Sequence, residues 1–182
     1  TMDHGAWNIL DHLPLGAVIL DQDFTALFWN RIMEAWTGEE RSSVLGRDLR
    51  DHCPGIKDPL CEPRIWEVIQ GGPSAIFPAH TQPRLFNCTT HSGSPRLQHV
   101  VVSKLETSDH GTCALLAVQD VTDAVVRHEL FKELRDVAAR ESEERGKMRQ
   151  ALRETRDELR RLATDDDLTG LMNRRRFLEL AK

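Results

Sequence analysis

Two segments, Leu97-Gln-His-Val-Val-Val-Ser-Lys-Leu105 and Thr112-Cys-Ala-Leu-Leu-Ala-Val-Gln119, decide the fold of this chain. Both are rich in apolar and β-branched residues, and the polar turn between them contains Asp109 and Gly111. This composition predicts two core strands that form a hairpin. Similar but shorter segments predict further strands at residues 16–21, 24–29, 75–77 and 84–90.

Short helices are predicted between the early and the late strands. Asn30 is placed to cap a helix over residues 31–36 that ends at Thr37-Gly38. Glycines and prolines divide residues 42–63 into short helical turns, and residues 64–70 predict one more helix that stops at Gly71-Gly72. The order of two strands, several helices and three strands predicts an α+β domain, in which an antiparallel sheet carries its helices on one face.

Composition excludes several classes of protein. The 182 residues carry 24 Lys and Arg against 29 Asp and Glu, a net charge of −5, and no basic block, so nucleic acid is not an expected partner. No apolar run approaches the roughly 18 residues that cross a bilayer, so we expect no membrane contact and a cytoplasmic location, although further domains could precede residue 1. The 4 cysteines form no CxxC pair, so neither a disulfide scaffold nor a structural metal site is predicted.

Residues 123–164 are highly charged, lack proline and predict one long helix. Its apolar residues recur at steps of three and four, which is a heptad pattern. Such a helix would span roughly 63 Å at about 1.5 Å per residue and needs a partner to cover its apolar stripe. We therefore predict a parallel coiled coil with a second copy of the chain. Position a holds Phe131, Ala138, Arg145, Leu152 and Leu159, and position d holds Leu134, Glu141, Met148, Thr155 and Leu162.

The centre of this stripe is polar. Glu141 and Arg145 occupy core positions, and the adjacent Gly146 costs about 1 kcal/mol of helix stability relative to alanine. Two interpretations stay open. The polar residues fix the parallel register, or the segment changes register or crossing angle when the sensor changes state.

The globular part resembles a PAS sensor domain over residues 7–122. The similarity lies in the run Ile9-Leu-Asp-His-Leu-Pro-Leu-Gly-Ala-Val-Ile-Leu-Asp21, in Trp29-Asn30, Thr37-Gly38 and Val44-Leu-Gly46, and in the closing Ala117-Val-Gln-Asp-Val-Thr122. In PAS proteins an Asp-x-Thr junction couples the sheet to an output helix, so the resemblance implies relay roles for Asp120 and Thr122. Thr122 is also predicted to cap a helix that starts at Asp123, where a carboxylate at 120 or 123 favours the helix N-terminus.

PAS folds often hold a small ligand between sheet and helices. The flavin-binding photoreceptor subclass carries a reactive cysteine where this chain has Leu49, and the histidine of many haem-binding relatives has no counterpart in residues 64–70, so neither flavin nor haem is supported by a motif. His52, Cys53 and Cys61 remain candidate ligands, since thiolate and imidazole bind haem iron and metals. The simpler interpretation is that these cysteines are small core residues. The ligand therefore stays unknown, and no metal site is assigned.

The last segment, Asp165-Asp-Asp-Leu-Thr-Gly-Leu-Met-Asn-Arg-Arg-Arg176-Phe177, resembles the opening of a GGDEF domain, the diguanylate cyclase fold. The matching residues are Asp166, Leu168, Thr169, Gly170, Leu171, Asn173 and Arg174. The family's Gly-Gly-Asp/Glu-Glu-Phe hairpin and metal-binding carboxylates do not occur in these 182 residues. We therefore expect an inactive fragment of a longer enzyme, with Thr1-Met2 as a cloning remnant.

Together the patterns predict a PAS domain at 1–122, a signalling coiled coil at 123–164 and the truncated start of a GGDEF domain at 165–182. The function they imply is the sensory and dimerisation region of a bacterial diguanylate cyclase, which would make cyclic di-GMP from two GTP with Mg²⁺. The alternative is a degenerate GGDEF domain that binds nucleotide without cyclase activity. A third interpretation is a ligand-free PAS domain that only dimerises, with a contact through Trp7, Ile9 and Leu10.

Overall fold

A computed structural model describes residues 7–80 and 84–164 of the chain. The chain divides into two compact units, with the boundary between Val126 and Arg127. The first unit holds the sheet, the short helices and the start of the last helix, and the second holds the rest of that helix. The segment 165–174, which carries the GGDEF-like motif, lies outside the described residues.

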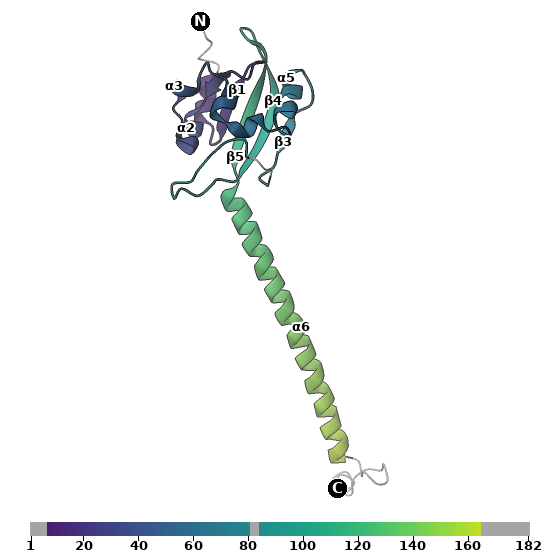
Figure 1. Cartoon of the computed structure of the whole chain (residues 1–182). Helices are drawn as coiled ribbons and strands as arrows, with labels where there is room; N and C mark the ends of the chain where they lie inside the picture. The colour runs from purple at the N-terminus through teal and green to yellow at the C-terminus, as the bar shows by residue number, and fades with distance from the viewer. Residues whose placement is uncertain (1–6, 81–83, 165–182) are drawn as a thin grey trace. The chain divides into compact units, whose positions relative to one another are not determined.

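One five-stranded antiparallel sheet, with strand order β2-β1-β5-β4-β3, organises the first unit (Figure 1). The predicted core hairpin is confirmed and is longer than expected, because each of its strands has 10 residues. The strands β1 and β2 flank it on one side and β3 on the other, so the sheet is assembled around β4 and β5. The strands are β1 (Gly16–Leu20), β2 (Ala26–Trp29), β3 (Ala75–Phe77), β4 (Gln98–Thr107) and β5 (Gly111–Asp120).

Asn30 joins the first two strands to helix α2 (Arg31–Thr37), as predicted for a capping residue. Its Oδ1 accepts hydrogen bonds from the backbone N–H groups of Met33 and Ala17, both at 3.1 Å. Its amide nitrogen donates to the carbonyls of Leu10 and Leu15. The side chain is fully buried, so these four partners account for a polar group that would otherwise be costly to bury.

The short helical turns between α2 and β3 also follow the prediction. They are α3 (Arg41–Val44), α4 (Leu49–His52), η2 (Pro54–Lys57) and α5 (Glu62–Ile69). Helix α2 ends at Gly38, whose φ of 77° is a left-handed conformation that glycine adopts without steric cost. Leu49, Ile56 and Ile65 are fully buried, so each of α4, η2 and α5 contributes to the core beneath the sheet.

The two faces of the sheet carry separate apolar clusters. Val18 and Leu20 belong to the main core with α2, α4 and α5, whereas Ala17 and Ile19 point to the opposite face, because side chains alternate along a strand. The predicted gathering of α2–α5 on one face is therefore confirmed. A short 3-10 helix, η1 (Asn8–His12), follows Trp7, whose indole ring packs edge to face against Phe28 on the opposite face at a centroid distance of 6.0 Å.

The strand predicted for residues 84–90 is wrong. Apart from an isolated bridge between Thr89 and Pro95, these residues form no regular structure. The adjacent residues Leu85 and Phe86 are both buried in the main core, which a strand does not allow because neighbouring side chains point to opposite faces. The apolar composition therefore marks a buried loop.

The long predicted helix is confirmed as α6 (Thr122–Thr164). Five apolar residues of its heptad stripe are largely exposed, with fractions from 60% to 75%: Phe131, Leu134, Met148, Leu152 and Leu159. Glu141 and Arg145 form an ion pair within the helix at 3.5 Å. The pairing of this helix with a second copy in a coiled coil stays a prediction.

Candidate functional site

The end of β5 is joined to α6 through Asp120 and Thr122. One carboxylate oxygen of Asp120 accepts hydrogen bonds from the Thr122 backbone N–H at 3.0 Å and from its hydroxyl at 2.6 Å. The Thr122 hydroxyl in turn accepts the N–H of Leu97 at 2.9 Å, and the N–H of Val121 donates to the carbonyl of Leu97 at 2.9 Å. The first residue of α6 is thus held by β5 and by the residue that precedes β4.

Arg96 connects this junction to the helical side of the domain. Its Nη1 pairs with the second oxygen of Asp120, and its Nε donates to the carbonyl of Thr89 at 2.8 Å. Its guanidinium carbon lies 5.0 Å from the ring centre of Trp36 on α2, which is a cation–π distance. Thr89 is itself bound to α2, because its N–H donates to the carbonyl of Trp36 at 2.8 Å. Arg96 therefore links α2, the loop before β4 and the start of α6.

The charge of Asp120 is stabilised at this junction. Burial by itself would raise the pKa of Asp120, but the hydrogen bonds from Thr122 and Arg96 outweigh it and lower the pKa below its ordinary value of 3.8. The side chains of Arg96 and Asp120 are only 16% and 23% exposed, so solvent screens this pair less than an exposed one.

The structure brings Asp120 and Thr122 together and changes the role predicted for Thr122. The helix begins at Thr122 rather than Asp123, and the Thr122 hydroxyl binds Asp120 and Leu97. Arg96 was missed, because its partner Asp120 is 24 positions away along the chain. The sequence offered one signal for this contact. A basic residue stands just before the strand that pairs with the strand ending at Asp120.

The other predicted relay residues lie further along α6. Glu141 and Arg145 are exposed and paired to each other, and a side chain added at Gly146 would meet no atom within 4 Å. These positions leave room for a second helix. Their part in a relay stays a prediction.

The three candidate ligand residues lie at the end of α4 and at the start of α5. His52 ends α4 with its Nδ1 at 3.7 Å from a carboxylate oxygen of Glu39, Cys53 follows it, and Cys61 precedes α5. Burial raises the pKa of the Cys53 thiol to about 12 and also raises that of Cys61, so both are neutral thiols at physiological pH. Within residues 7–80 and 84–164, no three His, Cys, Asp or Glu side chains gather as a metal site.

Side chains fill the space between the sheet and the helices, where PAS folds often hold ligands. Trp29 and Phe86 meet there edge to face at a centroid distance of 6.0 Å, and both are fully buried with Phe77. A cavity beside Phe77 and Gln98 measures about 10 Å³, the room of about one water molecule. Leu49, at the position of the photoreceptor cysteine, is also fully buried. A larger ligand would require these side chains to move.

Comparisons with known proteins agree with this architecture. A family described as the PAS fold matches residues 10–126. No curated protein matches the chain. Among solved structures, similarity is found to a sensory box sensor histidine kinase from Vibrio cholerae, with 19% identity, a TM-score of 0.49, and coverage of 64% of this chain and 90% of that one. The PAS domain of nitrogen regulation protein NR(II) from Vibrio parahaemolyticus has 17% identity, a TM-score of 0.46, and coverage of 66% and 99%.

No helix among the described residues is both long and apolar enough to cross a membrane. The matched region includes the whole sheet, the short helices and the Asp120 junction at the start of α6. The family match covers more than half of the chain, and the chain therefore belongs to the PAS family.

Proposed function

We propose that this chain is the sensory and dimerisation region of a diguanylate cyclase, and that the state of its PAS domain is relayed through α6. The observation that carries the proposal is the junction at Asp120, where one carboxylate binds the first residue of α6 with one oxygen and Arg96 with the other. A movement of α2 or of the loop before β4 would act on Arg96 and so on the start of the output helix.

The second part of the proposal is a homodimer. The five exposed apolar side chains on the heptad stripe of α6 would each gain about 1.5–3 kcal/mol from full burial, which a second copy in parallel register supplies. The ion pair between Glu141 and Arg145 lies within one helix and leaves both side chains more than half exposed. These two residues therefore remain able to contact a partner helix.

The output is inferred from the segment that follows α6. The residues from Asp166 to Arg174 resemble the opening of a GGDEF domain, and cyclases of that family need two GTP-loaded domains facing each other with divalent metal. A parallel helix pair that sets the relative rotation of the two domains would control their activity. Mg²⁺ and GTP would bind to that domain, beyond the residues present here.

A chimera tests the relay. Residues 1–182 are joined in frame to the catalytic part of an established diguanylate cyclase, and cyclic di-GMP formation from GTP is measured. We expect that inserting four residues in α6 after Gly146 shifts the heptad phase and changes the rate at least several-fold, whereas inserting seven residues keeps the phase and the original rate. Equal rates for both insertions would contradict the relay.

A further inference from the structure

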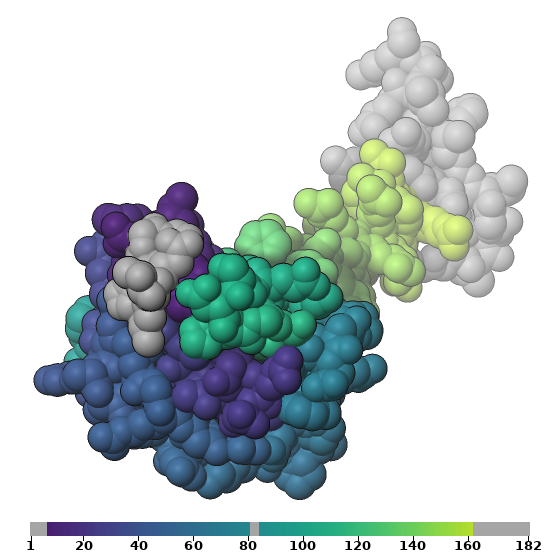
Figure 2. Space-filling model, turned by 90° about the horizontal axis from the view of Figure 1, so that it is seen from above, coloured from purple at the N-terminus to yellow at the C-terminus, as the bar shows by residue number. Residues whose placement is uncertain are grey.

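A groove lies beside strand β2, next to the apolar cluster that contains Ala17, Ile19 and Phe28. It has a volume of about 680 Å³, and its lining comes from η1, β2, α3 and the β4–β5 hairpin. Figure 2 shows the green tip of this hairpin beside purple residues from the first part of the chain. Small-molecule sites in proteins commonly measure about 300–1,000 Å³. The groove is therefore large enough for a small organic ligand.

The walls of the groove are aromatic and carry the cationic side chain of Arg41. Trp7 and Phe28 pack edge to face, and Leu105 extends the apolar surface. The guanidinium carbon of Arg41 lies 5.5 Å from the ring centre of Phe28, and its Nη2 binds Asp11 at 2.6 Å. The Nε of Arg41 is shielded from solvent and has no hydrogen-bond partner among the described residues. The Arg41 side chain as a whole is 35% exposed and lines the groove, so its guanidinium can donate to a molecule that supplies an acceptor.

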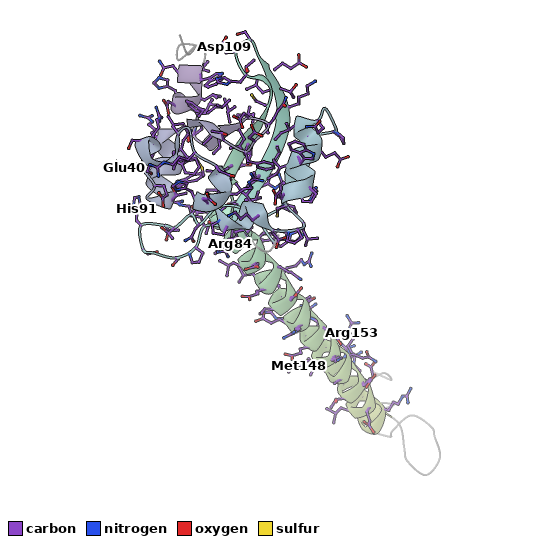
Figure 3. The ribbon with its side chains drawn as sticks, turned by 45° about the horizontal axis from the view of Figure 1, so that its top comes forward. Glu40, Arg84, His91, Asp109, Met148 and Arg153 are labelled. Atoms are coloured by element: carbon purple, nitrogen blue, oxygen red, sulfur yellow. The ribbon has the colours of Figure 1, made fainter. Side chains whose placement is uncertain are left out.

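The groove is connected to the junction by continuous strands. Residues 105–110 form the tip end of the hairpin, and Figure 3 shows Asp109 at this tip. The paired register runs from Thr107 opposite Gly111 to Gln98 opposite Asp120 without interruption. A ligand that moves the tip would therefore act on the two strands whose other ends hold Arg96 and Asp120.

We propose that the groove binds a small planar aromatic molecule that carries a carboxylate or carbonyl oxygen. Its ring lies against Trp7 and Phe28, and its oxygen accepts a hydrogen bond from the guanidinium of Arg41. Asp11 already balances the charge of Arg41, so a neutral or singly anionic molecule fits better than a dianion. The role of this molecule as the signal rests on the proposed function, whereas its binding does not.

Two matched probes, 1-naphthoate and 1-naphthylmethylamine, test the binding by saturation-transfer NMR on residues 1–182. They share the same rings but carry an acceptor and a cationic donor, respectively. We expect saturable binding of 1-naphthoate in the millimolar range or tighter. Binding of the amine should be at least about tenfold weaker, which is the usual worth of a charge-assisted hydrogen bond.

Variants locate the site. Arg41→Lys keeps a cation for Asp11 but removes the planar guanidinium, and should weaken 1-naphthoate binding about tenfold without loss of the thermal transition. Trp66→Ala removes a half-exposed tryptophan that stacks on Phe24 outside the groove, and should leave binding unchanged. No binding, equal binding of both probes, or binding that Arg41→Lys does not change would overturn the proposal. The proposal would also be overturned if Arg41→Lys changed the molecular mass of the protein in solution and did not weaken probe binding. A second copy of the chain would then occupy the groove. The effect of the four- and seven-residue insertions on the chimera is measured separately from probe binding. The relay and the ligand site can therefore each be disproved alone.

Discussion

Asp120 holds the sheet and α6 together through both oxygens of its carboxylate. One oxygen binds Thr122 twice and the other binds Arg96. Because both partners prefer the ionised form, the energy of the junction depends on the charge of this one side chain. Two predictions at this scale follow from the protonation states of Asp120 and of the cysteine thiols.

Asp120→Asn should lower the free energy of unfolding at pH 7 by about 1–3 kcal/mol, since the amide lacks the charge that Arg96 faces. The lowered pKa means that this contribution is fully present above the unfolded-state pKa of about 3.9 and is lost as the pH falls through the lower folded-state pKa. Urea unfolding of the unchanged chain and of Asp120→Asn at pH 7 and at pH 3 measures the loss and its pH dependence. Asp109→Asn, at the exposed hairpin tip, is the control. A deficit that is the same at both pH values would show that the charge of Asp120 is not responsible.

The native thiols should be inert in the folded protein. Burial raises the pKa values of Cys53 and Cys88 to about 12, and all 4 cysteines are buried and free. At pH 8 a disulfide reagent such as dithiodipyridine should react with none of them in minutes, and with all of them in urea, because the thiolate is the reactive form. Rapid modification of one cysteine in the folded chain would instead identify an accessible thiol.

At the scale of elements, local composition predicted most of the fold. The hairpin of β4 and β5, the cap at Asn30 and the end of α2 at Gly38 depend on neighbouring residues, so the sequence shows them directly. The loop from Arg84 was mistaken for a strand because its apolar residues reach the core without alternating. The contact of Arg96 with Asp120 and the groove were missed, because both are made by residues far apart in the sequence.

The polar centre of α6 either fixes the register of a helix pair or allows that register to change. Replacing both Glu141 and Arg145 by leucine would place apolar side chains at one d and one a position, and should tighten dimerisation at least about tenfold. Sedimentation equilibrium of residues 1–182 measures the affinity. In the chimera the same double variant should fix the cyclase rate and remove its response to the sensor. Unchanged affinity would show that these residues do not face a partner, and an unchanged response would exclude the switch.

At the scale of the whole molecule, the account requires two chains. In the proposed relay, the PAS domain supplies the state, the junction passes it to α6, and a second helix in register turns a movement of one chain into a change between two output domains. The exposed heptad stripe of α6 is the feature that requires this partner.

Disulfide cross-linking between two copies tests this requirement most directly. Met148 and Arg153 lie on different sides of α6 (Figure 3), at positions d and b of the predicted heptad. Because the native cysteines are buried, a cysteine introduced at either position is the reactive thiol. Mild oxidation of Met148→Cys should give a covalent dimer, since facing d positions in a parallel pair approach within about 7 Å, and Arg153→Cys should stay monomeric on a denaturing gel. Cross-linking of Arg153→Cys alone, or equal cross-linking of both variants, would contradict the parallel pair on which the relay depends.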